Sequence, residues 1–205
     1  MTNDPRNDFD ASKHSHRRFN PLTGGWVLVS PGRSERPWLG STVSSDLPPP
    51  QRFDIDCHLC PGNTRVSGAV NPNYEGTFVF TNDFSPFTCN NPMSVEESKD
   101  ELIRMETVDG ISRVICYSPH HSRTLPELSN YSVRKIIDTW CEQLNELGRR
   151  FIWVQIFENK GEVMGCSQPH PHGQIWATNF LPSEIVRKDQ NLRSYHETLG
   201  ENLLM

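Results

Sequence analysis

Short runs of β-branched and aromatic residues, each bounded by turn-forming residues, recur along the chain and predict strands. The predicted strands are 26–29, 77–81, 113–117, 153–157 and 174–177. Between the third and fourth of them, apolar residues recur at helical spacing from Val133 to Leu147. We expect Ser129 or Ser132 to cap the start of this helix and Gly148 to cap its end. Strands around one long helix indicate an α+β fold with an antiparallel sheet.

The chain has 205 residues, which suits one domain or slightly more. We expect residues 1–15, which are polar, to form a flexible arm, and residues 16–181 to form the main domain. Residues 182–205 are expected to begin a further helical part. The stretch 41–50 is rich in serine and proline and predicts a loop.

The charge and the apolar runs exclude two classes of partner. The formal net charge is −5 and the basic residues are scattered, which argues against a nucleic-acid-binding surface. No apolar run approaches the length of a membrane span, and residues 1–15 do not resemble a signal peptide. The sequence therefore predicts a cytoplasmic protein that binds neither nucleic acid nor membranes.

Six cysteines in a chain without a secretory signal are expected to be reduced thiols or metal ligands. Cys57 and Cys60 are separated by two residues and followed by Pro-Gly-Asn, a spacing that allows both thiolates to face one ion. The other four cysteines lack such a spacing and are expected to be buried apolar side chains. They are Cys89, Cys116, Cys141 and Cys166.

The segment 165–176 places His170, His172 and Gln174 at alternate positions. Pro171 excludes a helix here and biases its neighbour toward an extended backbone, so all three side chains are expected to project from one face of a strand. An imidazole in this setting can attack phosphorus and form a phosphoramidate, which suits nucleotidyl transfer. The other ring nitrogen must then donate a hydrogen bond, most simply to a backbone carbonyl.

The His-Pro-His-Gly-Gln run resembles the active-site signature of the galactose-1-phosphate uridylyltransferase family, a branch of the histidine-triad superfamily. Further segments resemble family blocks in family order: 16–24, 57–63, 80–84, 124–128 and 157–161. The resemblance implies a histidine-triad-like antiparallel sheet with packed helices, with one of the family's two repeats present.

The resemblance also implies a two-step reaction. His172 would displace glucose 1-phosphate from UDP-glucose, and galactose 1-phosphate would then take the uridylyl group to give UDP-galactose, a step of galactose catabolism in the Leloir pathway. The implied partners are these nucleotide sugars and hexose 1-phosphates, and the complete family forms homodimers.

The resemblance implies a structural zinc held by Cys57, Cys60, His121 and His170. Spacing alone leaves His58 and His120 as rival ligands, but the position of His121 before the block 124–128 favours it. The resemblance assigns the remaining site residues to substrate. Asn82 and Asp83 would contact uracil and ribose, Val66 and Phe80 would form the walls of the base slot, and the phosphate shell would comprise Arg33, Arg36, Asn159, Gly165, Cys166, Ser167 and Gln174.

Two features depart from the family pattern. Lys188 stands where the family has a glutamate ligand for a second metal, and because an ammonium group cannot coordinate a cation we expect zinc alone. The chain also ends before the family's second half, which carries hexose-binding residues. We therefore expect a fragment that is prone to associate and weak in turnover. Two alternatives stay open: a histidine-triad nucleotide hydrolase or adenylyltransferase, and a catalytically silent, zinc-stabilised nucleotide-binding fragment.

Overall fold

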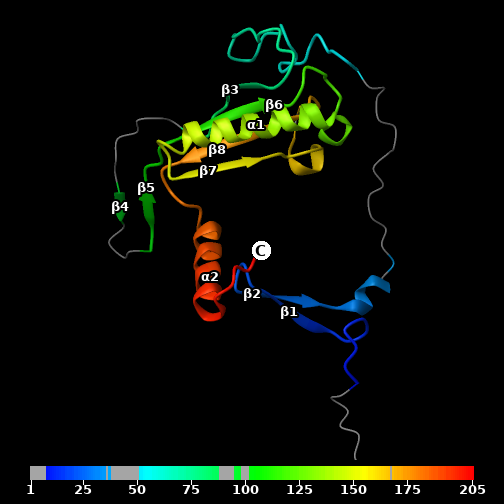
Figure 1. Ribbon diagram of the computed structural model, residues 1–205, viewed down its shortest axis with the longest axis vertical. Coiled ribbons are helices and arrows are strands. Elements are labelled where there is room, and N and C mark those ends of the chain that lie inside the picture. Colours follow the sequence, from blue (N-terminus) through cyan, green and yellow to red (C-terminus); the bar gives the residue numbers. More distant parts are fainter. Residues whose placement is uncertain (1–7, 36, 38–50, 88–94, 98–101, 167) are drawn as a thin grey trace, which may run out of the picture. The chain divides into compact units, whose positions relative to one another are not determined.

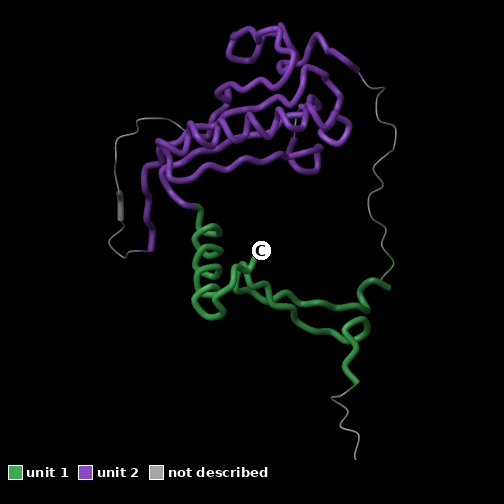
Figure 2. The backbone as a smooth tube through the Cα atoms, viewed as in Figure 1, with its two compact units in different colours: residues 1–47, 182–205 green, residues 48–181 purple. Residues whose placement is uncertain are grey.

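The structure is a computed structural model that describes residues 8–35, 37, 51–87, 95–97, 102–166 and 168–205. The predicted loop at 41–50, together with Arg36, Cys89 and Ser167, lies outside the described residues. Contacts within the chain divide it into two compact units, one formed by residues 48–181 and the other by residues 1–47 and 182–205 (Figure 2).

The unit 48–181 is built on a four-stranded antiparallel sheet in the order β3-β6-β8-β7 (Figure 1). The strands are β3 (Phe78–Thr81), β6 (Gly110–Cys116), β7 (Trp153–Phe157) and β8 (His172–Thr178). Four of the predicted strands are thereby confirmed, as is the α+β class. Strand β8 lies between β6 and β7, and its first residue, His172, is opposite Cys116 of β6.

Helix α1 (Asn130–Leu147) packs on this sheet and completes its core. The Ser129 side chain accepts a hydrogen bond from the Ser132 backbone N–H, and Gly148 ends the helix, so both predicted caps are confirmed. Ile136 of α1 is fully buried in a cluster that includes Ile115 of β6 and Ile175 of β8. The apolar face of α1 thus covers the side of β8 that lies opposite His172.

Shorter elements complete this unit. Strands β4 (Val95–Glu97) and β5 (Arg104–Glu106) pair as a separate two-stranded sheet. The 3-10 helices η3 (Leu125–Glu127) and η4 (Glu162–Met164) lie in the connections that precede α1 and β8.

The other unit contains a hairpin and a helix. Strand β1 (His16–Asn20) pairs with β2 (Gly25–Val29), and η2 (Pro31–Glu35) follows. The apolar pattern predicted β2 but not β1. Helix α2 (Ser183–Leu199) belongs to the same unit, because the Asn191 side chain donates to the Leu22 carbonyl in the hairpin turn. Contacts group residues 1–47 with 182–205, whereas the sequence analysis placed 16–47 in one domain with 48–181. None of the described helices has the length and apolar character of a membrane-spanning segment.

Candidate active site and metal centre

Strand β8 presents His172 and Gln174 on one face. Residues His172, Gln174 and Trp176 are half-buried, whereas the alternating residues between them are buried against the core. His172 and Gln174 therefore share a face as predicted. His170 does not join them on the strand, because it precedes β8 and its side chain is fully buried in a separate cluster.

Gly173 allows this strand to pack closely on its neighbours. A Cβ atom at this position would lie 2.5 Å from the Tyr117 hydroxyl and 3.1 Å from the Phe157 carbonyl oxygen. Tyr117 is itself buried, so its ring has little freedom to move away. The glycine in the His-Pro-His-Gly-Gln run is thus required by contact with the buried Tyr117.

The two ring nitrogens of His172 have different surroundings. Nδ1 lies 2.8 Å from the backbone carbonyl oxygen of His170. A carbonyl oxygen only accepts hydrogen bonds, so Nδ1 carries a proton and, in the neutral imidazole, Nε2 is the nitrogen with the lone pair. The sequence predicted a carbonyl partner of this kind, and the structure identifies it as His170.

Four buried side chains, Cys57, Cys60, His121 and His170, form a group whose ligand atoms all lie within 4.8 Å of one another. Sγ of Cys60 is 3.6 Å from Nδ1 of His121 and 3.5 Å from Nδ1 of His170, and Sγ of Cys57 is 3.8 Å from Nδ1 of His170. Ligands bound at ordinary zinc distances in a tetrahedron stand about 3.5 Å apart. The spacing and the donor set therefore fit a metal ion.

The four-residue group also shows which of the candidate histidines lie close enough to the cysteines to bind the same ion. His121 belongs to it, whereas His120 does not, among the described residues. His58 lies beside Cys57 in the sequence, but its Nδ1 is 3.0 Å from the Thr64 carbonyl oxygen. The two rivals that spacing left open are thus outside the four-residue group.

Burial shifts the pKa values of two of these four side chains, His170 and Cys57. It lowers the pKa of His170 to about 4, which leaves the imidazole neutral, as a metal ligand requires. The Ser118 carbonyl oxygen lies 3.0 Å from Nε2 of His170 and directs Nδ1 toward the sulfur atoms. Burial raises the pKa of the Cys57 thiol to about 11, a penalty on the thiolate that a bound cation would offset.

A cavity of about 270 Å³ opens beside His172. It brings together most of the residues expected to hold substrate, namely Val66, Phe80, Asn82, Asp83, Asn159, Gly165, Cys166 and Gln174. Arg33 lies in η2, in the other compact unit, while Arg36 and Ser167 are outside the described residues.

Arg65 also lines this cavity, although no pattern in the sequence indicated it. Its Nη1 is 3.2 Å from Oδ1 of Asp83, and its guanidinium carbon lies 4.2 Å from the centre of the Phe80 ring. The Arg65 and Asp83 side chains are each only 15% exposed. An isolated arginine in a loop forms no sequence pattern. The only feature of the sequence that could have indicated Arg65 is that it precedes Val66, a residue expected to contact the base.

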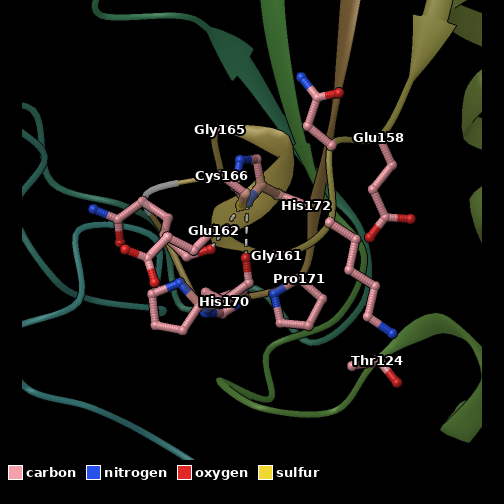
Figure 3. A pocket seen from close by; sticks show the side chains of 13 residues that line it. Thr124, Glu158, Gly161, Glu162, Gly165, Cys166, His170, Pro171 and His172 are labelled. Carbon is pink, nitrogen blue, oxygen red and sulfur yellow. Dashed lines mark hydrogen bonds between the residues drawn. The ribbon is translucent and has the colours of Figure 1, made fainter. Parts of the chain in front are cut away.

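A second cavity, of about 630 Å³, shares His172 with the first. Figure 3 shows His172 beside Gly165 and Cys166, where the chain returns from the 3-10 helix η4. The cavity wall also carries the charged residues Glu158, Lys160 and Glu162. The His172 imidazole therefore lines two cavities, and both of them also contain charged side chains.

The other cysteines follow the prediction only in part. Cys116 is buried, as expected, but Cys141 is exposed and Cys166 is half-buried in the cavity wall. Cys141 lies on the solvent side of α1, which the cysteine content alone does not reveal. The expectation of burial was wrong for these two residues.

Residues 7–182 match the family model for the galactose-1-phosphate uridyl transferase N-terminal domain. The chain belongs to this family. It is 50% identical to a galactose-1-phosphate uridylyltransferase of Haemophilus influenzae, over 96% of this chain and 56% of the relative. It is 46% identical to the enzyme of Rattus norvegicus, over 96% of this chain and 52% of the relative. The chain thus spans about half the length of the curated relatives it matches.

Solved structures agree on the fold. An ADP-glucose phosphorylase from Arabidopsis thaliana, with bound ADP-glucose, superposes with a TM-score of 0.68 at 22% identity, over 92% of this chain and 56% of the other. A uridylyltransferase structure gives a TM-score of 0.61 at 21% identity, over 93% of this chain and 54% of the other.

Proposed function

We propose that this chain carries the nucleotidyl-transfer site of a UDP-glucose:hexose-1-phosphate uridylyltransferase. The observation that carries the proposal is the bond between Nδ1 of His172 and the His170 carbonyl, which leaves Nε2 unprotonated at a cavity large enough for part of a nucleotide. The family membership and the high identity to curated uridylyltransferases support uridylyl over other nucleotidyl groups.

In the first step, Nε2 of His172 attacks the α-phosphorus of UDP-glucose. A P–N bond forms, the P–O bond to the β-phosphate breaks, and glucose 1-phosphate leaves with the bonding electrons. In the second step, a phosphate oxygen of galactose 1-phosphate attacks the same phosphorus, and the P–N bond breaks to give UDP-galactose. The leaving and entering groups are already ionised, so neither step requires a general acid, and positioning and charge stabilisation supply the rate.

The four-residue metal group is proposed to bind one structural zinc. Two thiolates and two imidazoles complete a tetrahedron and leave no open position for water. The ion would hold His170 in place, and the His170 carbonyl in turn orients His172. Lys188, at the position of the family's second metal ligand, pairs with Glu184 at 2.9 Å, and a single metal is proposed.

We assign the substrate contacts as the resemblance suggests. Within the cavity, Asn82 and Asp83 contact uracil and ribose, Val66 and Phe80 bound the base, and Asn159, Gly165, Cys166 and Gln174 hold the phosphates. The resemblance adds Ser167, Arg33 and Arg36 to the phosphate contacts. A cytoplasmic location and a homodimer, as in the complete family, are part of the same proposal.

The test is to incubate the 205-residue chain with UDP-glucose labelled in its α-phosphate and to map the protein-bound label. The expected product is a uridylyl group on His172 that is labile in acid and resistant to alkali, as a phosphoramidate is. His172→Ala should carry no label, while Cys141→Ser, an exposed change on α1, should label as the wild type does. Label on another residue, or equal labelling from ADP-glucose, would contradict the proposal.

A further inference from the structure

Trp176 lies two residues after Gln174 on the same face of β8 and contacts its side chain. The indole Nε1 of Trp176 is 3.2 Å from Oε1 of Gln174. An indole nitrogen can only donate, so the amide oxygen must face Trp176 and the amide NH₂ group must point away from it. Gln174 lines the cavity that holds His172, whereas Trp176 does not.

The indole is itself held in orientation by two aromatic rings. Phe87 meets it edge to face with centroids 5.2 Å apart, and Phe157 does so at 5.4 Å. Phe157 also pairs with Gln174 across β7 and β8. The donor that selects the amide rotamer is therefore fixed by packing on two sides.

We propose that Trp176 is a positioning residue, whose indole N–H holds the Gln174 amide so that its NH₂ group donates to the oxygens of the phosphate attacked by His172. The inference rests on the proposed function and deepens it. Without the indole N–H, the Gln174 amide can rotate by about 180° and present its oxygen to the phosphate. The amide oxygen and the phosphate oxygens are all hydrogen-bond acceptors, so this orientation loses the hydrogen bond and is repulsive. Among the described residues, no protein acceptor satisfies the NH₂ group, so it remains available for a ligand.

The decisive variant is Trp176→Phe, which removes the indole N–H and keeps an aromatic ring between Phe87 and Phe157. The rate of His172 labelling at saturating UDP-glucose is expected to fall about threefold to tenfold, the effect of one neutral hydrogen bond. The half-saturating concentration should change less than about twofold, because the base and ribose contacts are untouched. Trp140→Phe is the matched control, since the Trp140 indole nitrogen is buried without a partner among the described residues.

Two Gln174 variants separate positioning from packing. In a Gln174→Ala background, Trp176→Phe should have no further effect on the labelling rate, because no amide remains to be oriented. Gln174→Glu keeps an acceptor for Trp176 but presents no donor, and should be at least as slow as Gln174→Ala. A wild-type rate in Trp176→Phe, or an equal loss in both backgrounds, would overturn the inference.

If the wild-type chain takes no label from UDP-glucose, the proposed function fails. The hydrogen bond between Trp176 and Gln174 can then be tested separately by NMR. The Trp176 indole proton should exchange with solvent more slowly than in Gln174→Ala, and the Gln174 side-chain amide signals should shift in Trp176→Phe. An indole proton with the same exchange rate in both proteins would show that the amide is not its partner.

Discussion

At the scale of single residues, the position of His172 depends on how closely β8 approaches Tyr117. Gly173→Ala would place a methyl group 2.5 Å from the Tyr117 hydroxyl. We expect this change to lower the free energy of unfolding by about 1–3 kcal/mol, as overpacking of a core does. The displaced strand should also slow His172 labelling. Urea unfolding measures the first effect and the labelling assay the second.

The companion change is Tyr117→Phe, which removes the atom that clashes. The nearest ring atom left on residue 117 is 3.2 Å from the position of the added methyl carbon, so the double variant should recover part of the lost stability. Equal unfolding free energies for wild type and Gly173→Ala would show that the strand accommodates the methyl group, and would remove this explanation of the glycine.

Arg65 is the second residue-scale prediction. Arg65→Met keeps much of the side-chain length but removes the ion pair with Asp83 and the charge over Phe80. If Asp83 contacts the ribose, the half-saturating concentration of UDP-glucose should rise about tenfold, the loss expected of one charged hydrogen bond. The maximal labelling rate should change little, because the contact is made equally before and during the reaction.

The control is Arg134→Met, which breaks an exposed ion pair with Asp138 on α1. Exposed pairs of this kind contribute little, so labelling should be unaffected. A change in maximal rate with an unchanged half-saturating concentration in Arg65→Met would place Arg65 at the reacting phosphate instead of the nucleotide contact.

At the scale of elements, α1 is tied to the sheet by an ion pair as well as by its apolar face. Arg113 of β6 donates to both carboxylate oxygens of Glu146, at 2.6 and 2.9 Å. The hydrogen bond from Arg113 holds the pKa of Glu146 below its usual range. The Glu146 side chain is 56% exposed, so solvent screens the pair and its contribution is expected to be at most about 1 kcal/mol.

The sign of its pH dependence follows from the lowered pKa. The ionised carboxylate stabilises the fold above the unfolded-state pKa of about 4.3, and this stabilisation is lost as the pH falls through the lower folded-state pKa. Glu146→Gln should therefore be slightly less stable than wild type at pH 7, and the difference should vanish toward about pH 3. Urea unfolding across this range, with Glu142→Gln as a control on the same helix, measures it. A difference that grows as the pH falls would contradict the ion pair.

Sequence patterns predict the elements that are stabilised by residues within the same segment. The strand around Ile175 and the helix from Ser129 to Gly148 follow from apolar spacing and capping, and both were confirmed. The pairing of α2 with the hairpin was not predicted, because it depends on Asn191 reaching Leu22 across 169 residues. No property of either segment alone reveals that contact.

At the scale of the whole molecule, the metal group joins three segments that are far apart in the sequence. Cys57 and Cys60 lie before β3, His121 follows β6, and His170 precedes β8. Spacing identified the two cysteines but left other histidines as rivals of His121. The choice depends on where β6 ends relative to the cysteine loop, which is a property of the folded sheet. The place of Arg65 in the cavity could not be predicted for the same reason, since Arg65 and Asp83 come together only after folding.

The last prediction concerns the metal. Because the ligands come from distant segments, the binding free energy of the ion adds to the folding free energy of the unit 48–181. The purified chain should contain one zinc, and chelation should lower its melting temperature and slow His172 labelling, because the His170 carbonyl would be held less firmly.

Cys57→Ser and Cys60→Ser should reproduce both effects, whereas Cys141→Ser, which changes an exposed thiol outside the group, should keep its zinc and its stability. Folded, metal-free protein with an unchanged melting temperature would show that the four side chains pack without an ion, and would separate the orientation of His172 from any metal.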